Sequence, residues 1–201
     1  MKLEDVQIIR KAFLLLLFVG LFALFAVSAA RPVFVGSPAI TISVGCVLII
    51  VCILGRTWCS LYIGGKKISQ LVISGPYSVC RNPLYFFSIL GSAGIGMQTG
   101  SLVLGLFVAL AVAAVFHVVV KREERALLDQ HGVAYANYLK TVPRMLPNLL
   151  IWKGSIDDQY DARLVRRTFF DASIFLIAIP YQAVIRFFQL HEILPVLLQL
   201  P

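Results

Sequence analysis

Long apolar stretches alternate with polar segments along the chain, and this pattern predicts membrane-spanning helices. A helix that crosses a bilayer needs about 17–25 predominantly apolar residues. Three stretches are of this order, namely Ala12 to Ala30, Ala39 to Leu54 and Ser101 to Val120. A fourth, Leu84 to Met97, is apolar but short, and a fifth, Phe169 to Phe188, is long enough but is interrupted by a proline and three polar side chains. We therefore predict an all-α fold, a polytopic transmembrane helical bundle of about five spans.

The first apolar stretch has an alternative interpretation as a signal peptide. Lys2, Arg10 and Lys11 precede it, and it ends in small residues such as a cleavage site requires. Its apolar run is longer than the core of a typical signal peptide, which has about 7–15 residues. We therefore expect it to be retained as a span, with its basic flank as a cytoplasmic anchor.

A short polar turn at 98–100 joins the predicted spans Leu84 to Met97 and Ser101 to Val120, which are third and fourth in chain order. Pro83 can occupy the first position of the third helix, because proline there loses no helical hydrogen bond. The segment Leu84 to Val120 then forms a helical hairpin whose two ends return to the same bilayer surface. We expect the polar groups at 81–85 and 121–124 to meet at that surface.

The composition and the charges agree with a membrane protein. Hydrophobic residues make up 59% of the 201 residues, above the usual content of about 45–50% in soluble domains. If the five spans alternate from a cytoplasmic N-terminus, only Arg31 and Arg186 of the 18 Lys and Arg residues fall outside the cytoplasmic segments. This asymmetry predicts that the N-terminus and the two loops with the polar groups at 81–85 and 121–124 face the cytoplasm, and we expect the protein to lie in the cell inner membrane. The asymmetry also explains the net charge of +8 by contact with anionic membrane lipids, without a nucleic-acid partner.

The cysteines and a glycine-rich run could suggest binding sites, but their spacing and position favour a structural role. The four cysteines show no paired spacing, so we predict neither a disulfide framework nor a metal site. The run Gly91 to Gly96 resembles a nucleotide-binding loop, but no strand precedes it. Its position in an apolar helix favours close packing of helices through small residues.

Two adjacent acids, Glu123 and Glu124, are the main candidates for chemistry. They follow the apolar stretch Ser101 to Val120 at the surface where basic residues are favoured, and ionisable groups at a membrane boundary usually have a function or a partner. His117 lies one turn before Lys121 and is about as suited to packing as to catalysis.

The polar segments resemble a known family. The motifs that carry the resemblance are Ser74-Gly75-Pro76-Tyr77, Arg81-Asn82-Pro83-Leu84-Tyr85, Glu123-Glu124 and Val142-Pro143-Arg144-Met145-Leu146-Pro147. In order and spacing they are similar to the isoprenylcysteine carboxyl methyltransferase family and its bacterial relatives, with phospholipid N-methyltransferases as neighbours. The resemblance covers residues 62–147. We expect a single domain, 1–201, with this family-like core and a C-terminal extension, 148–201, that holds the fifth helix.

The resemblance implies S-adenosylmethionine as cofactor, bound without a Rossmann fold in a pocket capped by cytoplasmic loops. Aromatic faces can stabilise its sulfonium by about 0.5–2 kcal/mol, and a carboxylate can pair with its ammonium group. The implied cofactor-binding residues are Ser69, Gln70, Leu71, Val72, Tyr77, Arg81, Asn82, Pro83, Leu84, Tyr85 and Glu123. The candidate catalytic residues are Glu124, Arg144 and His117.

Two departures from the family pattern affect the acceptor side. Asn82 stands where the family usually has histidine, and Val119 stands where the family leads us to expect an arginine that holds the acceptor's carboxylate. Lys121, Arg122 and Arg144 are candidates to substitute for it. The acceptor is therefore left open as a carboxylate or an amine of a hydrophobic, membrane-embedded or lipidated molecule, and the oligomeric state is open too.

Two other functions fit the same sequence. One is a membrane-bound sterol or lipid reductase that uses NADPH. The other is a non-catalytic membrane scaffold, which a collapsed space between Tyr85 and Glu123 would favour.

Overall fold

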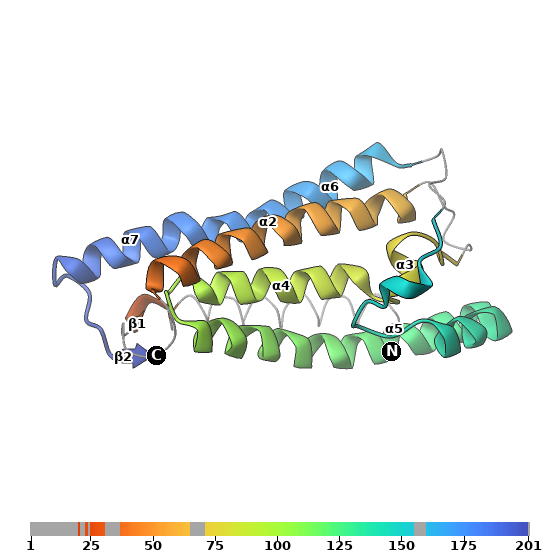
Figure 1. The fold of residues 1–201 in the computed structure, drawn as a ribbon, viewed down its shortest axis with the longest axis horizontal. Helices are drawn as coiled ribbons and strands as arrows, with labels where there is room; N and C mark the ends of the chain where they lie inside the picture. The colour runs from red at the N-terminus through yellow and green to blue at the C-terminus, as the bar shows by residue number, and fades with distance from the viewer. Residues whose placement is uncertain are drawn as a thin grey trace. The chain divides into compact units, whose positions relative to one another are not determined.

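The computed structural model describes residues 20, 23, 25–30, 37–64, 71–154 and 160–200. Over these residues the regular secondary structure is helical apart from one short pair of strands (Figure 1). The helices are α2 (Pro38–Ile63), α3 (Pro76–Val79), α4 (Pro83–Met97), α5 (Leu102–Thr141), α6 (Ala162–Ser173) and α7 (Ala178–Leu190), with 3₁₀ turns η1 (Leu149–Ile151) and η2 (Ile174–Ile177). The predicted all-α class is confirmed.

The strands β1 (Ser28–Ala30) and β2 (Leu198–Leu200) pair in parallel. The first predicted span, Ala12 to Ala30, lies mostly outside the described residues. Its last three residues were expected to be helical but form β1 instead, because the end of the chain returns to supply a pairing partner.

Three helical stretches are long and apolar enough to cross a membrane. They are α2, α5 and the stretch from α6 to α7, Ala162–Leu190. The helix α4 is apolar but has only 15 residues. This chain is therefore a helical membrane protein, and four of the five predicted spans correspond to helices among the described residues.

The described helices extend beyond the apolar stretches that predicted them. α2 continues past Leu54 to Ile63, and α5 continues past Val120 to Thr141, with a break at Gly132 (φ 51°, ψ −124°). Hydropathy marks only the part of a helix that lipid covers, so it does not mark the polar continuation. In α5 this continuation supplies the acidic pair and the residues that follow it.

The fifth predicted span is divided. α6 begins at Ala162, seven residues before the predicted start, where the Asp161 side chain accepts hydrogen bonds from the backbone N–H groups of Arg163 and Leu164. The 3₁₀ turn η2 separates α6 from α7, which has Pro180 as its third residue. Proline offers no backbone N–H and clashes with the carbonyl four residues earlier, which accounts for the irregular turn before it.

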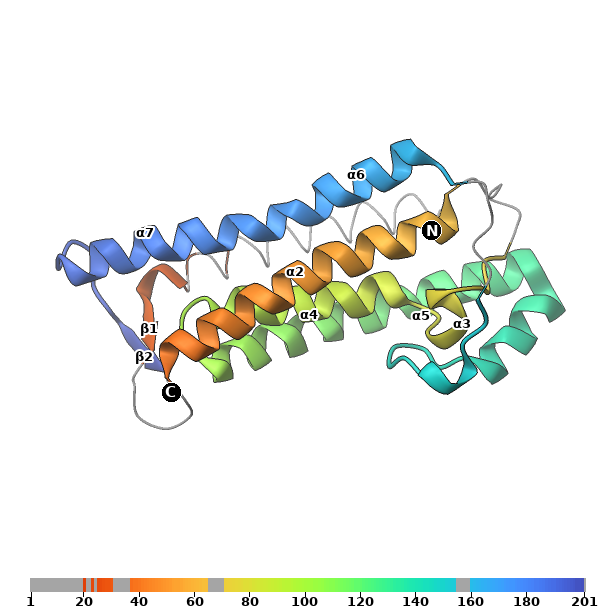
Figure 2. The same ribbon diagram turned by 45° about the horizontal axis from the view of Figure 1, so that its top comes forward.

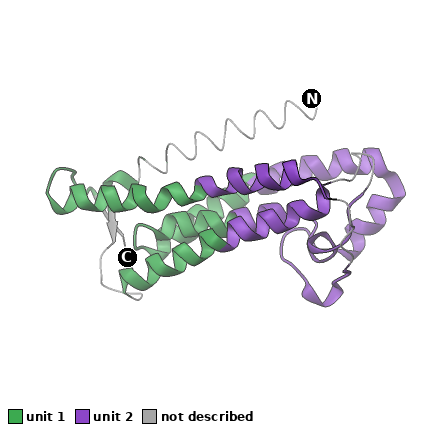
Figure 3. Cartoon of the chain, turned by 90° about the horizontal axis from the view of Figure 1, so that it is seen from above, with its two compact units in different colours: residues 1–50, 89–115, 175–201 green, residues 51–88, 116–174 purple. Residues whose placement is uncertain are grey.

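The chain folds into two compact units, which Figure 3 colours separately. Unit 1 contains residues 1–50, 89–115 and 175–201, and unit 2 contains residues 51–88 and 116–174. The helices α2, α4 and α5 each contribute a segment to both units.

Unit 1 is packed through small residues. A Cβ atom added to Gly94 would lie 2.6 Å from the carbonyl oxygen of Gly45, and one added to Gly96 would lie 2.7 Å from the Cα of Gly105. The backbones of α4 and its two neighbours therefore approach closely, and α4 and α5 run side by side in both ribbon views (Figures 1 and 2). The packing role predicted for the glycine run is confirmed.

Unit 2 holds the polar segments. A tight turn at Gly75 (φ 59°) leads into α3, and a Cβ atom there would lie 2.1 Å from the ring of Tyr62. Two aromatic clusters form its core. One joins Cys59, Tyr62 and Tyr77, and the other joins Tyr135, Tyr138 and Val142.

Candidate functional site

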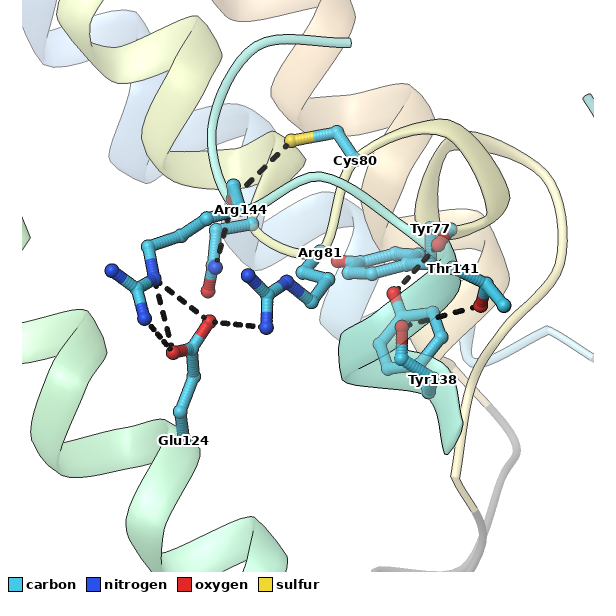
Figure 4. A network of polar contacts seen from close by, with 8 residues as sticks. Tyr77, Cys80, Arg81, Glu124, Tyr138, Thr141 and Arg144 are labelled. Carbon is cyan, nitrogen blue, oxygen red and sulfur yellow. Dashed lines mark hydrogen bonds and ion pairs between the residues drawn. The ribbon is translucent and has the colours of Figure 1, made fainter. Parts of the chain in front are cut away.

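The carboxylate of Glu124 binds two arginines in unit 2 (Figure 4). Arg144 Nη2 lies 2.8 Å and Nε 3.0 Å from its Oε2, and Arg81 Nη1 lies 3.2 Å from its Oε1. The Glu124 and Arg81 side chains are only 8% and 10% exposed. A carboxylate buried to this degree is stable because charged donors replace the water it has lost.

Three separate segments supply this cluster. Arg81 comes from the loop before α4, Glu124 from the polar part of α5, and Arg144 from the segment after α5. The hydrogen bond to Glu124 raises the already high pKa of Arg144. The expected meeting of the Arg81 and Glu124 motifs is confirmed by these contacts.

The second acid, Glu123, is bound by a tyrosine. The hydroxyl of Tyr85 donates to Glu123 Oε1 over 2.8 Å, and the Tyr85 ring packs against Phe116 with centroids 4.6 Å apart. The family resemblance implies that both side chains bind the cofactor, whereas here they contact each other directly. Any bound group must therefore lie beside this pair or displace it.

The segment 143–145 lies against the loop before α4. The backbone N–H of Arg81 donates to the carbonyl of Pro143 over 2.9 Å, and the Asn82 amide donates to the carbonyl of Arg144 over 3.0 Å. Cys80 Sγ lies 3.2 Å from the carbonyl of Met145, and burial raises the pKa of this thiol to about 11. Asn82, which replaces the family's histidine, thus uses its side chain to hold the backbone that carries Arg144.

An aromatic cluster lies next to this loop. Tyr77 packs with Cys59 and Tyr62, and the predicted residues Val72 and Leu84 pack against the same cluster. The backbone carbonyl of Tyr77 accepts a hydrogen bond from the Tyr138 hydroxyl over 2.6 Å. Burial raises the pKa of the Tyr77 phenol well above the ordinary value.

The remaining predicted residues fall in other places. Leu71 packs against the second aromatic cluster, and Pro83 is the buried first residue of α4. Ser69 and Gln70 lie outside the described residues. His117 is exposed on α5, and its seven-residue separation from Glu124 corresponds to about 10 Å along the helix axis. The structure therefore does not bring His117 to the arginine cluster.

Sequence reasoning missed several residues of unit 2. Trp58 stacks on Trp152 with centroids 5.7 Å apart and an interplanar angle of 13°. Arg56, in α2, donates to the hydroxyl of Ser88. An arginine next to an apolar stretch is itself a signal of function, and this signal could have identified Arg56.

Unpartnered polar atoms show what the site could hold. Four buried side-chain atoms of unit 2 have no hydrogen-bond partner among the described residues: Arg56 Nε, Ser74 Oγ, Tyr77 Oη and Arg81 Nε. Buried donors normally have a partner, so each needs an explanation. Donors of this kind beside aromatic rings suit a ligand with carboxylate and hydroxyl groups and a cationic centre. The donors and tyrosine rings present are chemically compatible with such a ligand. The described residues contain no group of three or more His, Cys, Asp or Glu side chains that could hold a metal ion.

The fold and the Arg–Glu–Arg cluster around the buried Glu124 define a class, polytopic helical membrane proteins with a polar site formed by loops and helix ends. The model of the phospholipid methyltransferase family matches residues 32–132, and the chain belongs to this family. The matched region includes both the Arg81 to Tyr85 motif and the acidic pair.

Two curated relatives are similar to part of the chain. The cobalt-zinc-cadmium resistance protein CzcN of Cupriavidus metallidurans is 42% identical over 100 residues, which are 50% of this chain and 46% of the relative. The nickel-cobalt-cadmium resistance protein NccN of Alcaligenes xylosoxydans xylosoxydans is 35% identical over 116 residues, 58% of this chain and 54% of the relative. The chain thus spans about half the length of these relatives. No solved structure matches it.

Proposed function

We propose that this chain transfers a methyl group from S-adenosylmethionine to a hydrophobic, membrane-embedded acceptor, at a site that faces the cytoplasm. One observation carries the proposal. The motif segments of a phospholipid methyltransferase family member meet in one cluster, in which Arg81 and the partly exposed Arg144 hold the buried carboxylate of Glu124.

The residues around this cluster would hold the cofactor. Bound there, S-adenosylmethionine supplies an activated methyl group on a sulfonium. The rings of Tyr77 and Tyr62 offer the negative faces that attract such a cation. The free donors of Ser74 and Arg81 would bind its carboxylate or ribose oxygens. The role of the ion pairs is to keep these groups oriented, since a transfer of this kind depends mainly on alignment.

The acceptor side needs a polar contact of its own. Val119 is buried where the family resemblance implies an arginine, and Lys121 and Arg122 are exposed. The Nε and Nη2 groups of Arg144 already donate hydrogen bonds to Glu124. Arg56 has a buried donor without a partner among the described residues, and we assign it the contact with the acceptor's polar head.

A binding titration tests the cofactor assignment. The purified full chain is titrated with S-adenosylmethionine and with its demethylated product by calorimetry. The variants are Tyr77→Leu and Arg81→Gln, with Asp129→Asn on the exposed surface of α5 as the control. We expect each site variant to bind about tenfold more weakly or worse, which corresponds to about 1.4 kcal/mol, and the control to bind normally. Absence of affinity in the unmodified chain would remove the assignment.

A labelled-methyl assay tests the reaction. Chain incubated with labelled cofactor and a membrane lipid extract should yield a labelled, lipid-soluble product, and Arg56→Gln should lower the yield while cofactor binding persists. Oxidation of NADPH with a lipid, in place of methyl release, would identify the reductase alternative.

One observation favours the second candidate, a non-catalytic scaffold. The direct hydrogen bond between Tyr85 and Glu123 closes the space that a ligand would enter between them. Tyr85→Phe separates the two functions. In an enzyme it should change cofactor affinity or turnover, whereas in a scaffold there is neither activity nor cofactor affinity to change.

The names of the two relatives associate them with resistance to cobalt, zinc, nickel and cadmium. We propose that methyl transfer by this chain likewise supports growth under metal stress. Deletion of its gene should then lower the tolerated metal concentration, and the Glu124→Gln variant should fail to restore it.

A further inference from the structure

Unit 1 contains a cavity of about 300 Å³ that shares no lining residue with the arginine cluster of unit 2. Its polar lining comes from Ser28 of β1, from Thr99 after α4, and from Gln182, Arg186 and Gln189 of α7. This volume is at the lower end of the range for small-molecule sites, about 300–1,000 Å³. It suits a compact polar group such as a phosphate with a few neighbouring carbons.

A buried amide in this cavity lacks a partner. Gln182 is 2% exposed, and its Nε2 has no hydrogen-bond partner among the described residues. The polar side chains of Gln189 and Thr99 in this cavity do have hydrogen-bond partners. Gln189 donates to the carbonyl of Ala26 over 3.1 Å, and Thr99 donates to the carbonyl of Gly96 over 2.8 Å. A ligand with an acceptor oxygen would satisfy the Gln182 amide.

The charge of the cavity is positive. Arg186 is the only Lys or Arg among the described residues of unit 1, and its Nε donates to the carbonyl of Gln182 over 3.3 Å. The only described acid of this unit, Glu192, is exposed and does not line the cavity. An arginine in a membrane segment, with no acid in the described lining, calls for an anionic partner.

The rest of the lining is apolar. Ile42, Leu190 and Val196 surround the polar groups, and Leu190 is 81% exposed. An arginine and a free amide beside exposed aliphatic side chains match a molecule with an anionic head and a hydrocarbon tail.

We propose that this cavity binds the anionic head of a membrane amphiphile, with its phosphate or carboxylate on Arg186 and the Gln182 amide. The tail lies along the aliphatic side chains of the rim. This site is separate from the arginine cluster of unit 2 and does not depend on the proposed methyl transfer.

Native mass spectrometry of the purified full chain tests the proposal. The probes are phosphatidic acid and phosphatidylcholine with identical acyl chains, and inorganic phosphate as a competitor. We expect preferential binding of phosphatidic acid, and binding about tenfold weaker in Arg186→Gln because a charge-assisted contact is lost. Arg186→Lys should retain part of the affinity. The control is Arg166→Gln, an exposed arginine of α6.

Gln182→Leu separates a binding role from a structural one. Replacing a buried amide whose Nε2 has no partner among the described residues by an apolar side chain should leave the melting temperature equal or higher, while phosphatidic acid binds several-fold more weakly. This variant also decides the matter if Arg186→Gln does not fold. Equal affinity for the two lipids, or unchanged phosphatidic acid binding in Gln182→Leu, would overturn the proposal. Displacement of the lipid by an equal concentration of inorganic phosphate would also overturn the proposal. The site would then recognise the anion alone, with no contribution from the hydrocarbon tail.

Discussion

Glu124 shows how one residue can organise several segments. Its two oxygens join the loop before α4 to the segment after α5 through Arg81 and Arg144. Burial increases the strength of such contacts and also the cost of removing one partner. The conformation of the candidate site therefore depends on one carboxylate more than on any neighbouring polar residue.

Glu124→Gln should be strongly destabilising. It leaves the 10% exposed Arg81 side chain without its counter-charge, and loss of one partner of a buried pair typically costs about 3–5 kcal/mol. The measurement is the free energy of unfolding in mixed detergent micelles. Asp129→Asn, exposed on the same helix, should change this free energy by less than about 0.5 kcal/mol. Equal effects of the two substitutions would contradict the central role of Glu124.

Gly75 and Gly132 separate backbone strain from steric clash. Both have positive φ, but a Cβ atom meets the Tyr62 ring at Gly75 and nothing within 4 Å at Gly132. Gly132→Ala should cost about 1–3 kcal/mol from strain alone, because its ψ of −124° lies outside the left-handed helical region. Gly75→Ala should cost about 1–3 kcal/mol more from overpacking. Thermal unfolding of both variants checks the difference, and a larger effect at Gly132 would count against the Tyr62 contact.

At the scale of elements, α4 has two different functions along its length. Its first residues, Pro83 to Tyr85, belong to unit 2 and complete the motif that begins in the preceding loop at Arg81, and Tyr85 binds Glu123 there. Its later glycines pack unit 1 through direct backbone approach. A helix of 15 residues can do both because small residues bring neighbouring helices close enough to be held by van der Waals contact.

Gly94→Val should disrupt the packing between α4 and α2. Even the first added carbon would lie 2.6 Å from the carbonyl oxygen of Gly45, so the helices must separate, at a cost of about 1–3 kcal/mol. Ala114→Val adds a similar side chain at an exposed position of α5 and should be nearly neutral. Retained thermal stability in Gly94→Val would show that this approach is unimportant.

At the scale of the whole molecule, the basic residues predict the orientation in the membrane. The polar segments of unit 2 hold most of the Lys and Arg residues described by the structure, whereas described unit 1 has only Arg186. Cytoplasmic segments of membrane proteins carry such an excess. We therefore expect Thr141, at the end of α5, to face the cytoplasm.

Cysteine labelling in intact cells checks this orientation. In a background without the native cysteines, Thr141→Cys should react with a membrane-impermeant maleimide only after permeabilisation. His191→Cys, just after α7, should react in intact cells, because the stretch Ala162–Leu190 is long enough to cross the bilayer. If both sites are labelled only after permeabilisation, the α6–α7 stretch lies in the interface and does not cross.

The sequence by itself determined the helices, the α4–α5 hairpin and the meeting of the Arg81 and Glu124 motifs. Apolar length, the polar turn at 98–100 and Pro83 are local signals, and two helices joined by a short turn must bring their far ends together. Hydropathy could not show the polar continuation of α5, since lipid does not cover it.

Only the tertiary structure decided which side chains pair. The sequence identifies Arg144 only as one of several candidate cations. Its bond to Glu124 depends on how the chain reverses after Gly132. The direct contact of Tyr85 with Glu123 and the lining of the unit 1 cavity are equally undetermined by local signals. Such pairs join residues distant in the chain, and their geometry follows from the packing of whole elements.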